Sequence, residues 1–262
     1  MSIEKMKAFV LKTLPYRESS GIFYLLTERQ GVVHGIAKGI RKKKTGASFL
    51  ERGFLIEALV YVKPHRELHT LGDVQMIDYY PRIRNDLVKG AIRDAAFETI
   101  LTNVSAGFPS PELFSFVTEF LFALEDRTGH LPSLLWNFFA VFSRLMGFGM
   151  DCKRCVSCKK ELSCACNVSL MIEKGGFVCE KCADLSGPRT LFPPEALGFL
   201  GAQNISEIPA SVVNLSLADE RRVTRLLASY CHYHCDTRSD FKALEFMDSL
   251  LFYDPAQPGQ TG

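Results

Sequence analysis

Short apolar segments separated by glycine or proline run through the first eighty residues and predict a series of β-strands. The segments are rich in valine, isoleucine, leucine and aromatic residues, which suit the pleated, half-buried surface of a sheet. The predicted strands cover residues 7–14, 22–27, 32–37, 54–62 and 68–74. Five strands in so short a stretch predict a small β-barrel, and the five-stranded OB type fits this count. An SH3-like barrel is the alternative, because the pattern does not give the strand order.

The pattern changes to a helical one after residue 86. In residues 111–126 apolar side chains recur every three or four positions and a proline stands first, which is typical of an amphipathic helix. Residues 134–146 are apolar nearly all round, so we expect them to form the central buried helix of a helical domain. Further helices are predicted at residues 94–104, 194–200 and 218–235. The fold class is therefore α+β, with a helical domain after the barrel.

Length and composition predict a globular protein of about two domains. The chain has 262 residues, of which 47% are hydrophobic. The N-terminus lacks the apolar core of a secretory signal, and no apolar run reaches the roughly 18 residues that a membrane span needs. We therefore expect a cytoplasmic protein with no membrane partner.

Positive charge is concentrated in the predicted barrel. Residues 1–80 carry 13 Lys and Arg against 8 Asp and Glu, an excess of +5, although the whole chain has a net charge of only +2. Five cations lie within seven residues after the third predicted strand. They are Lys38, Arg41, Lys42, Lys43 and Lys44. Cations in this arrangement neutralise the phosphates of a nucleic acid, so we predict DNA contacts here. A solvated charge run is the alternative.

Aromatic residues near the basic stretch are candidates for stacking on nucleic-acid bases. They are Phe23, Tyr24, Phe49 and Tyr61. Positions in the hydrophobic core are the more common role for such residues, so none is singled out.

Two C-x2-C pairs, Cys155 with Cys158 and Cys179 with Cys182, predict a tetrahedral zinc site. Four thiolates leave no coordination position for water, so the zinc is expected to be structural rather than catalytic. Gly175 and Gly176 precede the second pair and allow the backbone to turn back towards the metal. Three further cysteines leave the choice of ligands open, and free or disulfide-bonded cysteines are the alternative. The three are Cys152, Cys164 and Cys166.

A second cysteine pair, Cys231 and Cys235, lies one helical turn apart beside His232 and His234. The cysteines share a helix face, but the histidines point elsewhere, so buried core cysteines are favoured over a second metal site. No phosphate-binding glycine loop, nucleophile elbow or compact carboxylate pair occurs in the sequence. The chain is therefore not expected to be an enzyme.

The order of these parts resembles the bacterial RecO family of recombination mediators. The matching stretches are SSGIFYLLTERQGVVHGIAKGIRKK, ELHTLGDVQMID, GFGMDCKRCVSC and KGGFVCEKC. The resemblance implies an ATP-independent protein of DNA repair and recombination that binds single- and double-stranded DNA and anneals complementary strands. It also implies contacts with the single-strand-binding protein and RecR, help in loading RecA, and a place near the bacterial nucleoid. Lys38 and Arg41 to Lys44 would bind DNA, and the two C-x2-C pairs would bind zinc.

We thus expect four parts: an OB-fold nucleic-acid-binding domain at 1–80, a helical domain at 81–150 and 187–253, a zinc-binding insertion at 151–186, and a disordered tail at 254–262. Two other functions remain open. The chain could be a zinc-stabilised scaffold for protein interactions without direct DNA activity, or a barrel that binds structured RNA.

Overall fold

The computed structural model of the chain describes residues 2–40, 50–62, 66–162, 167–184, 191–202, 205, 208, 215–235 and 242–251. These residues belong to two compact units. The first comprises Met1–Asp86 and Phe97–Leu121, and the second Leu87–Ala96 and Phe122–Gly262. The predicted division at residues 80, 150 and 186 remains an expectation, and the predicted tail at 254–262 lies outside the described residues.

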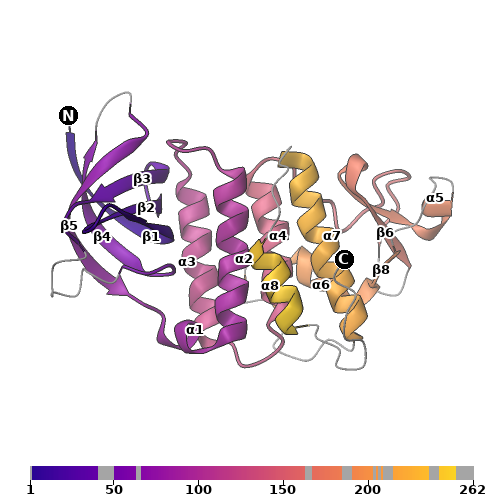
Figure 1. Cartoon of the computed structure of the whole chain (residues 1–262). Coiled ribbons are helices and arrows are strands. Elements are labelled where there is room, and N and C mark those ends of the chain that lie inside the picture. Colours follow the sequence, from indigo (N-terminus) through magenta and orange to yellow (C-terminus); the bar gives the residue numbers. More distant parts are fainter. Residues whose placement is uncertain are drawn as a thin grey trace. The chain divides into compact units, whose positions relative to one another are not determined.

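A closed five-stranded barrel forms the first unit's β-structure (Figure 1). The strands follow one another around it in the order β1-β2-β3-β5-β4, and β1 closes it by pairing with β4. Strand β3 pairs with β5 in parallel, while the other pairs are antiparallel. This order confirms the OB-type barrel. The strands are β1 (Ser2–Tyr16), β2 (Ser20–Thr27), β3 (Gly31–Ala37), β4 (Leu55–Val62) and β5 (Leu68–Asp78).

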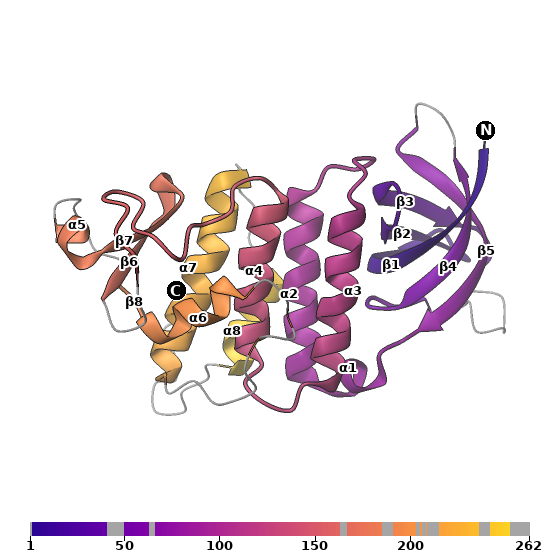
Figure 2. The same cartoon turned by 180° about the vertical axis from the view of Figure 1, so that it is seen from behind.

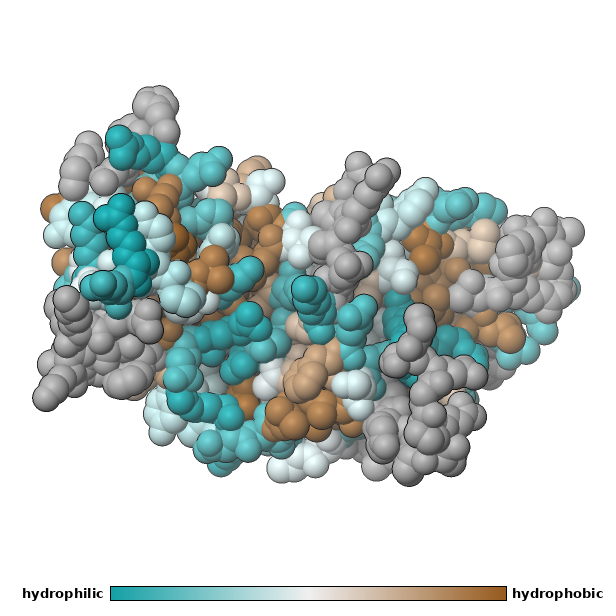
Figure 3. All heavy atoms as spheres, in the orientation of Figure 1, coloured by the Kyte–Doolittle hydropathy of each residue, from teal (hydrophilic) through white to brown (hydrophobic). Residues whose placement is uncertain are grey.

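Among the described residues, 14 form a buried cluster that fills the interior of the barrel, and they include Val10, Phe23, Leu25 and Val60. Side chains alternate between the two faces of a strand, so the outward positions carry mixed residues. Hydrophilic and hydrophobic side chains lie side by side over the barrel in Figure 3. Ile40 and Leu50, on either side of the undescribed residues 41–49, both belong to the core cluster. Residues 41–49 are therefore flanked on both sides by buried residues of the barrel core.

Gly31 fixes the turn between β2 and β3. Its φ is +63°, and a Cβ atom there would lie 1.8 Å from the backbone oxygen of Phe108. The Thr27 hydroxyl donates to the Gly31 carbonyl at 2.9 Å and accepts from the Gln30 N–H at 3.0 Å. Only glycine fits both the left-handed backbone and this close approach.

The helices agree closely with the sequence prediction. Helix α3 has the predicted bounds, and α4 is buried throughout residues 132–143, which confirms it as a central buried helix. Helix α2 begins seven residues before the predicted start at residue 94, and α8 was not predicted individually. The helices are α1 (Pro81–Asn85), α2 (Leu87–Asn103), α3 (Pro111–Asp126), α4 (Pro132–Leu145), α5 (Glu180–Asp184), α6 (Pro194–Gly201), α7 (Leu217–Cys235) and α8 (Lys242–Leu251).

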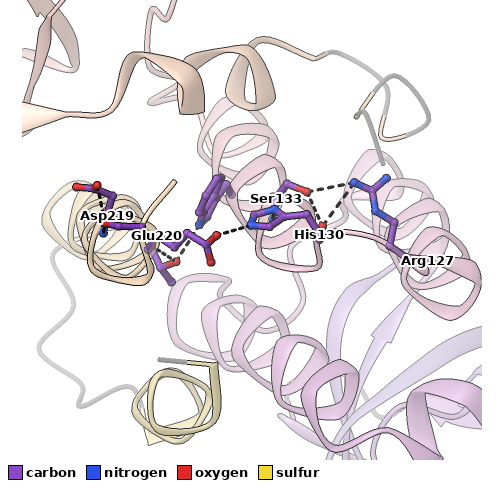
Figure 4. A network of polar contacts seen from close by, with 8 residues as sticks. Arg127, His130, Ser133, Asp219 and Glu220 are labelled. Atoms are coloured by element: carbon purple, nitrogen blue, oxygen red, sulfur yellow. Dashed lines mark hydrogen bonds and ion pairs between the residues drawn. The ribbon is translucent and has the colours of Figure 1, made fainter. Parts of the chain in front are cut away.

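A buried polar network joins α7 to the start of α4 in the second unit (Figure 4). The backbone N–H of Ser133 donates to Nδ1 of His130 at 3.2 Å, so the ring proton is on Nε2. Nε2 donates to Oε1 of Glu220 at 3.0 Å. Arg127 donates to the hydroxyl of Ser133 at 3.2 Å, whereas Asp219 faces away from His130. The hydroxyl lacks a contact with the imidazole, so the network orients helices rather than activating a nucleophile.

The second unit also holds a small three-stranded sheet with the order β7-β6-β8 (Figure 2). Its strands are β6 (Val168–Met171), β7 (Gly176–Cys179) and β8 (Leu191–Phe192). A 3₁₀ turn at Ile172–Lys174 joins β6 to β7, and α5 follows β7 directly. The second C-x2-C pair lies at the end of this sheet, with Cys179 as the last residue of β7 and Cys182 on α5. Among the described helices, none combines the length and apolarity required to cross a membrane.

Candidate metal centre and nucleic-acid interface

The four predicted cysteine ligands come together in the second unit. The sulfur atoms of Cys155, Cys158, Cys179 and Cys182 all lie within 4.8 Å of one another, and the Sγ atoms of Cys158 and Cys179 are 3.8 Å apart. Cys155 is buried, Cys158 is exposed, and the other two are intermediate. A tetrahedral zinc with bonds of about 2.3 Å requires sulfur separations of about 3.8 Å. The arrangement therefore fits a tetrahedral metal ion with four cysteine ligands.

Two backbone elements position these sulfurs. The first pair lies on a tight turn that ends at Lys159, whose φ is +63° and whose N–H donates to the Cys155 carbonyl at 2.8 Å. The second pair lies where β7 gives way to α5. The Val156 N–H donates to the Phe177 carbonyl at 2.9 Å and holds the turn against β7.

The two glycines before the second pair have different roles. Gly175 has a φ of +74°, which is the turn conformation that the sequence analysis expected. At Gly176 a Cβ atom would lie 2.7 Å from Cγ1 of Val156 and 3.2 Å from the backbone nitrogen of Asp151. Gly176 is therefore required by close packing between the turn and the strand.

The electrostatics of the cluster favour a bound cation. Burial opposes ionisation of the Cys155 thiol, but backbone N–H groups of Cys158 and Cys179 donate to its sulfur and lower its pKa to about 6. Hydrogen bonds with the sulfurs of Cys158 and Cys179 raise the pKa of Cys182 to about 12. Without a cation, four sulfurs this close cannot all be thiolates. A divalent metal ion offsets the repulsion between the thiolates, so all four sulfurs can be deprotonated and bind it.

The remaining cysteines lie apart from this cluster or outside the described residues. Cys152 donates its thiol to the Met150 carbonyl at 3.7 Å, and burial first of all raises its pKa to about 12. Cys231 is fully buried on α7 beside the Phe139 carbonyl, which confirms the core role predicted for it. Cys164 and Cys166 lie outside the described residues.

The predicted DNA-contacting residues are described only in part. Lys38 is exposed immediately after β3, whereas Arg41, Lys42, Lys43 and Lys44 lie outside the described residues. Their contacts with DNA remain a prediction.

Lys38 lines a groove that the sequence analysis did not anticipate. The groove has a volume of about 550 Å³ and lies where the β1–β2 turn meets the end of β3. Its lining residues are Tyr16, Arg17, Glu18, Ser19, Ser20, Ile36, Lys38 and Gly39. Tyr16 and Arg17 are an aromatic and a basic residue between two predicted strands, and that pairing is the sequence signal which could have identified them.

The aromatic candidates of the sequence analysis divide between the core and the outer face. Phe23 belongs to the barrel core at 2% exposure, so it is not available for base stacking. Tyr24 and Tyr61 are partly buried, and Phe49 lies outside the described residues. The Tyr24 ring lies 4.3 Å from the ring of His34, with the Lys12 ammonium 5.7 Å from its centroid.

Comparisons with known proteins agree with both parts of this structure. The family model "Recombination protein O N terminal" matches residues 1–80, and "Recombination protein O C terminal" matches residues 84–241. A DNA repair protein RecO from Geobacter metallireducens is 30% identical over 203 residues, which are 77% of this chain and 80% of that protein. The RecO protein from Clostridium novyi is 29% identical over 71% of this chain and 72% of its own length. The RecO protein from Bacillus subtilis is 25% identical over 95% of this chain and 95% of its own length. The chain belongs to the RecO, or recombination protein O, family.

Proposed function

We propose that this chain is a DNA-binding recombination mediator in DNA repair. It binds single- and double-stranded DNA, anneals complementary strands, and acts with RecR to load RecA onto DNA coated with the single-strand-binding protein. It works in the bacterial cytoplasm at the nucleoid. The names of its relatives, as DNA repair proteins, support the general role.

The observation that carries this proposal lies at the end of β3, where the chain continues into the basic stretch. This strand ends at Ala37, and the exposed Lys38 leads towards four consecutive cations in the sequence. Cations on such a segment bind phosphates and release counterions, so binding tolerates any sequence and weakens with salt. Annealing needs no nucleophile, because the protein neutralises two strands and base pairing supplies the remaining free energy.

The cysteine cluster has a structural role in this proposal. Four cysteine ligands complete the coordination of a tetrahedral zinc and leave no position for a reacting water. The zinc therefore holds the small sheet together, and the DNA-binding activity resides in the barrel. The protein has no catalytic residues in this mechanism.

Charge reversal of Lys42, Lys43 and Lys44 to glutamate tests the proposal. Gel-shift titrations at several salt concentrations should show weaker binding to single-stranded DNA. The negative slope of log affinity against log salt concentration should become shallower by about 2. The three lysines would each lose one phosphate contact, and roughly 0.7 counterions are released per contact on single-stranded DNA. Lys153, Lys160 and Lys181 are exposed lysines of the second unit, and their reversal to glutamate is a control with the same net charge.

Equal affinity and slope for the two triple variants would remove the basic stretch from the mechanism. An annealing assay on complementary strands coated with the single-strand-binding protein then tests the mediator role. A protein-interaction scaffold would show no salt-sensitive DNA shift, and an RNA-binding barrel would prefer structured RNA to single-stranded DNA.

A further inference from the structure

We propose that the groove between the β1–β2 turn and the end of β3 binds one unpaired nucleotide of single-stranded DNA. The base stacks on Tyr16, and the adjoining phosphate binds between Arg17 and Lys38. This inference rests on the proposed function and gives it a specific site. It also assigns a preference for unpaired over paired DNA to one end of the barrel.

The size and lining of the groove suit a nucleotide. Its volume of about 550 Å³ lies in the range of roughly 300–1,000 Å³ that is usual for small-molecule sites. The lining combines the aromatic Tyr16, the apolar Ile36 and the polar residues Ser19 and Ser20. A nucleotide offers matching groups, namely a flat base, a sugar and an anionic phosphate.

Tyr16 is the stacking platform of the groove. It is the last residue of β1, pairs with Ser20 across the turn, and is 36% exposed. The Arg17 guanidinium lies 5.4 Å from the centre of the Tyr16 ring. The guanidinium lies over one face of this ring, and the two together form a platform on which a base can stack, because both groups present a π-face.

The backbone of Arg17 is in an unusual conformation that places this side chain at the groove. Its φ is +52°, in the left-handed region that glycine adopts freely and long side chains seldom adopt. Strained residues of this kind cluster at ligand-binding sites, where the surrounding structure holds them in place. Gly39, which also lines the groove, has a φ of +68°, and among the described residues a Cβ there would meet nothing within 4 Å.

The charge of the lining favours an anion. Arg17 and Lys38 oppose the single carboxylate of Glu18, and the basic stretch continues in sequence from Lys38. These cations alone would bind paired and unpaired DNA similarly. Tyr16 makes the difference, because a base in a duplex is already stacked on its neighbours and cannot lie on the ring.

The test measures how much of the affinity comes from the bases. Fluorescence anisotropy gives the Kd of the full chain for a short oligo-dT, for an abasic strand of equal length, and for a blunt duplex. The wild type should bind oligo-dT about fivefold or more tightly than the abasic strand. Tyr16→Ala should abolish that preference without changing duplex affinity, and Tyr16→Phe should restore it. Arg17→Ala should weaken binding to oligo-dT and to the abasic strand.

Two matched variants serve as controls. Tyr79→Ala removes a tyrosine of the first unit that is 44% exposed and does not line the groove. Arg29→Ala removes an exposed arginine from the turn at the other end of β2. Both should retain the preference for oligo-dT over the abasic strand, and thermal melting checks that every variant is folded.

The outcomes separate this proposal from the proposed function. Equal binding of the wild type to oligo-dT and the abasic strand would overturn the nucleotide groove and leave the DNA-binding function intact. The nucleotide groove would also be overturned if the Tyr16→Ala variant kept the preference for oligo-dT over the abasic strand. The same conclusion would follow if this variant lost as much affinity for the duplex as for oligo-dT. Absence of DNA binding by the wild type would overturn the proposed function, and with it this site.

Discussion

The barrel and the cysteine-bearing sheet are two small β-structures that are stabilised in different ways. The barrel has strands of 7 to 15 residues, and 14 of its described residues form one buried cluster. The cysteine-bearing sheet has strands of 2 to 4 residues. Phe177 and Phe192 of this sheet are buried, but the described cluster around its cysteines contains only Cys155, Val178 and Ala183 as buried residues. So few buried apolar groups around the cysteines make this part of the sheet dependent on a metal or another cross-link. The barrel has a larger buried cluster and needs no such cross-link.

Metal removal should have the largest effect and should separate the two regions. A structural zinc site contributes on the order of 10 kcal/mol to folding. Chelation, or Cys179→Ser, should therefore remove the hydrogen-exchange protection of β6 and β7 but leave that of β1 to β4 unchanged. Metal analysis should give about one zinc per chain before chelation. Cys152→Ser, outside the cluster, is the control and should keep the metal. Full hydrogen-exchange protection of β6 and β7 in metal-free protein would show that the cysteine-bearing sheet does not depend on the metal.

A cavity in the barrel core should have the opposite regional effect. Leu25 is fully buried inside the barrel, so Leu25→Ala should lower the free energy of unfolding of the barrel by about 2–5 kcal/mol. Hydrogen exchange in β2 measures this loss, and zinc content should stay constant. Ile3→Ala is the matched control, because Ile3 is 61% exposed on β1. Loss of zinc from the Leu25 variant would show that the two regions are not independent.

Gly176→Ala tests the close packing that positions the cysteine turn. The new methyl group would overlap Val156 and the Asp151 backbone, which should cost about 1–3 kcal/mol and weaken zinc retention. Gly198→Ala is a control of the same chemistry in the same unit. Gly198 is an exposed helical residue of α6, and no described residue lies within 4 Å of a Cβ placed there, so that change should stabilise the protein by about 0.5–1 kcal/mol. Equal zinc retention and stability in the two variants would refute the packing argument.

The pH dependence of the barrel should give the smallest effect. Burial lowers the pKa of His34 below its usual value near 6.5, with nearby Glu67 raising it and His69 lowering it by smaller amounts. The neutral ring is therefore favoured in the folded state, and its contribution to stability is present above about pH 6.5 and declines as the pH falls through that value. Urea titrations at pH 5 and 8 should show a smaller loss of stability at low pH for His34→Gln than for the wild type. Identical losses would exclude His34 as the cause.

Much of the fold could be predicted because its signals are local. Each predicted strand corresponds to an observed one, and the helix at Pro111–Asp126 has the predicted ends. Helical periodicity and a leading proline are properties of adjacent residues. The sequence did not reveal which of the neighbouring residues Phe23 and Tyr24 faces inward. That choice depends on the register of β2 against β1 and β3, since a shift of one residue exchanges the two faces.

The cysteine cluster was predictable for a related reason. Its four cysteines occur as two C-x2-C pairs, and the thiolate chemistry of zinc limits what such spacing can form. The groove could not be derived in this way. Tyr16 and Lys38 line the same groove only because β1, β2 and β3 pair in antiparallel order, which brings the first turn to the end of the third strand.

The sequence by itself therefore determined the five barrel strands, the longer helices α2, α3, α4 and α7, the basic stretch and the two C-x2-C pairs, since each depends on residues close together in the chain. The tertiary structure decided how the barrel closes, which aromatic rings are buried, and which side chains share the groove. Those features depend on strand pairing between distant residues, and the free energy of that pairing is a property of the whole barrel.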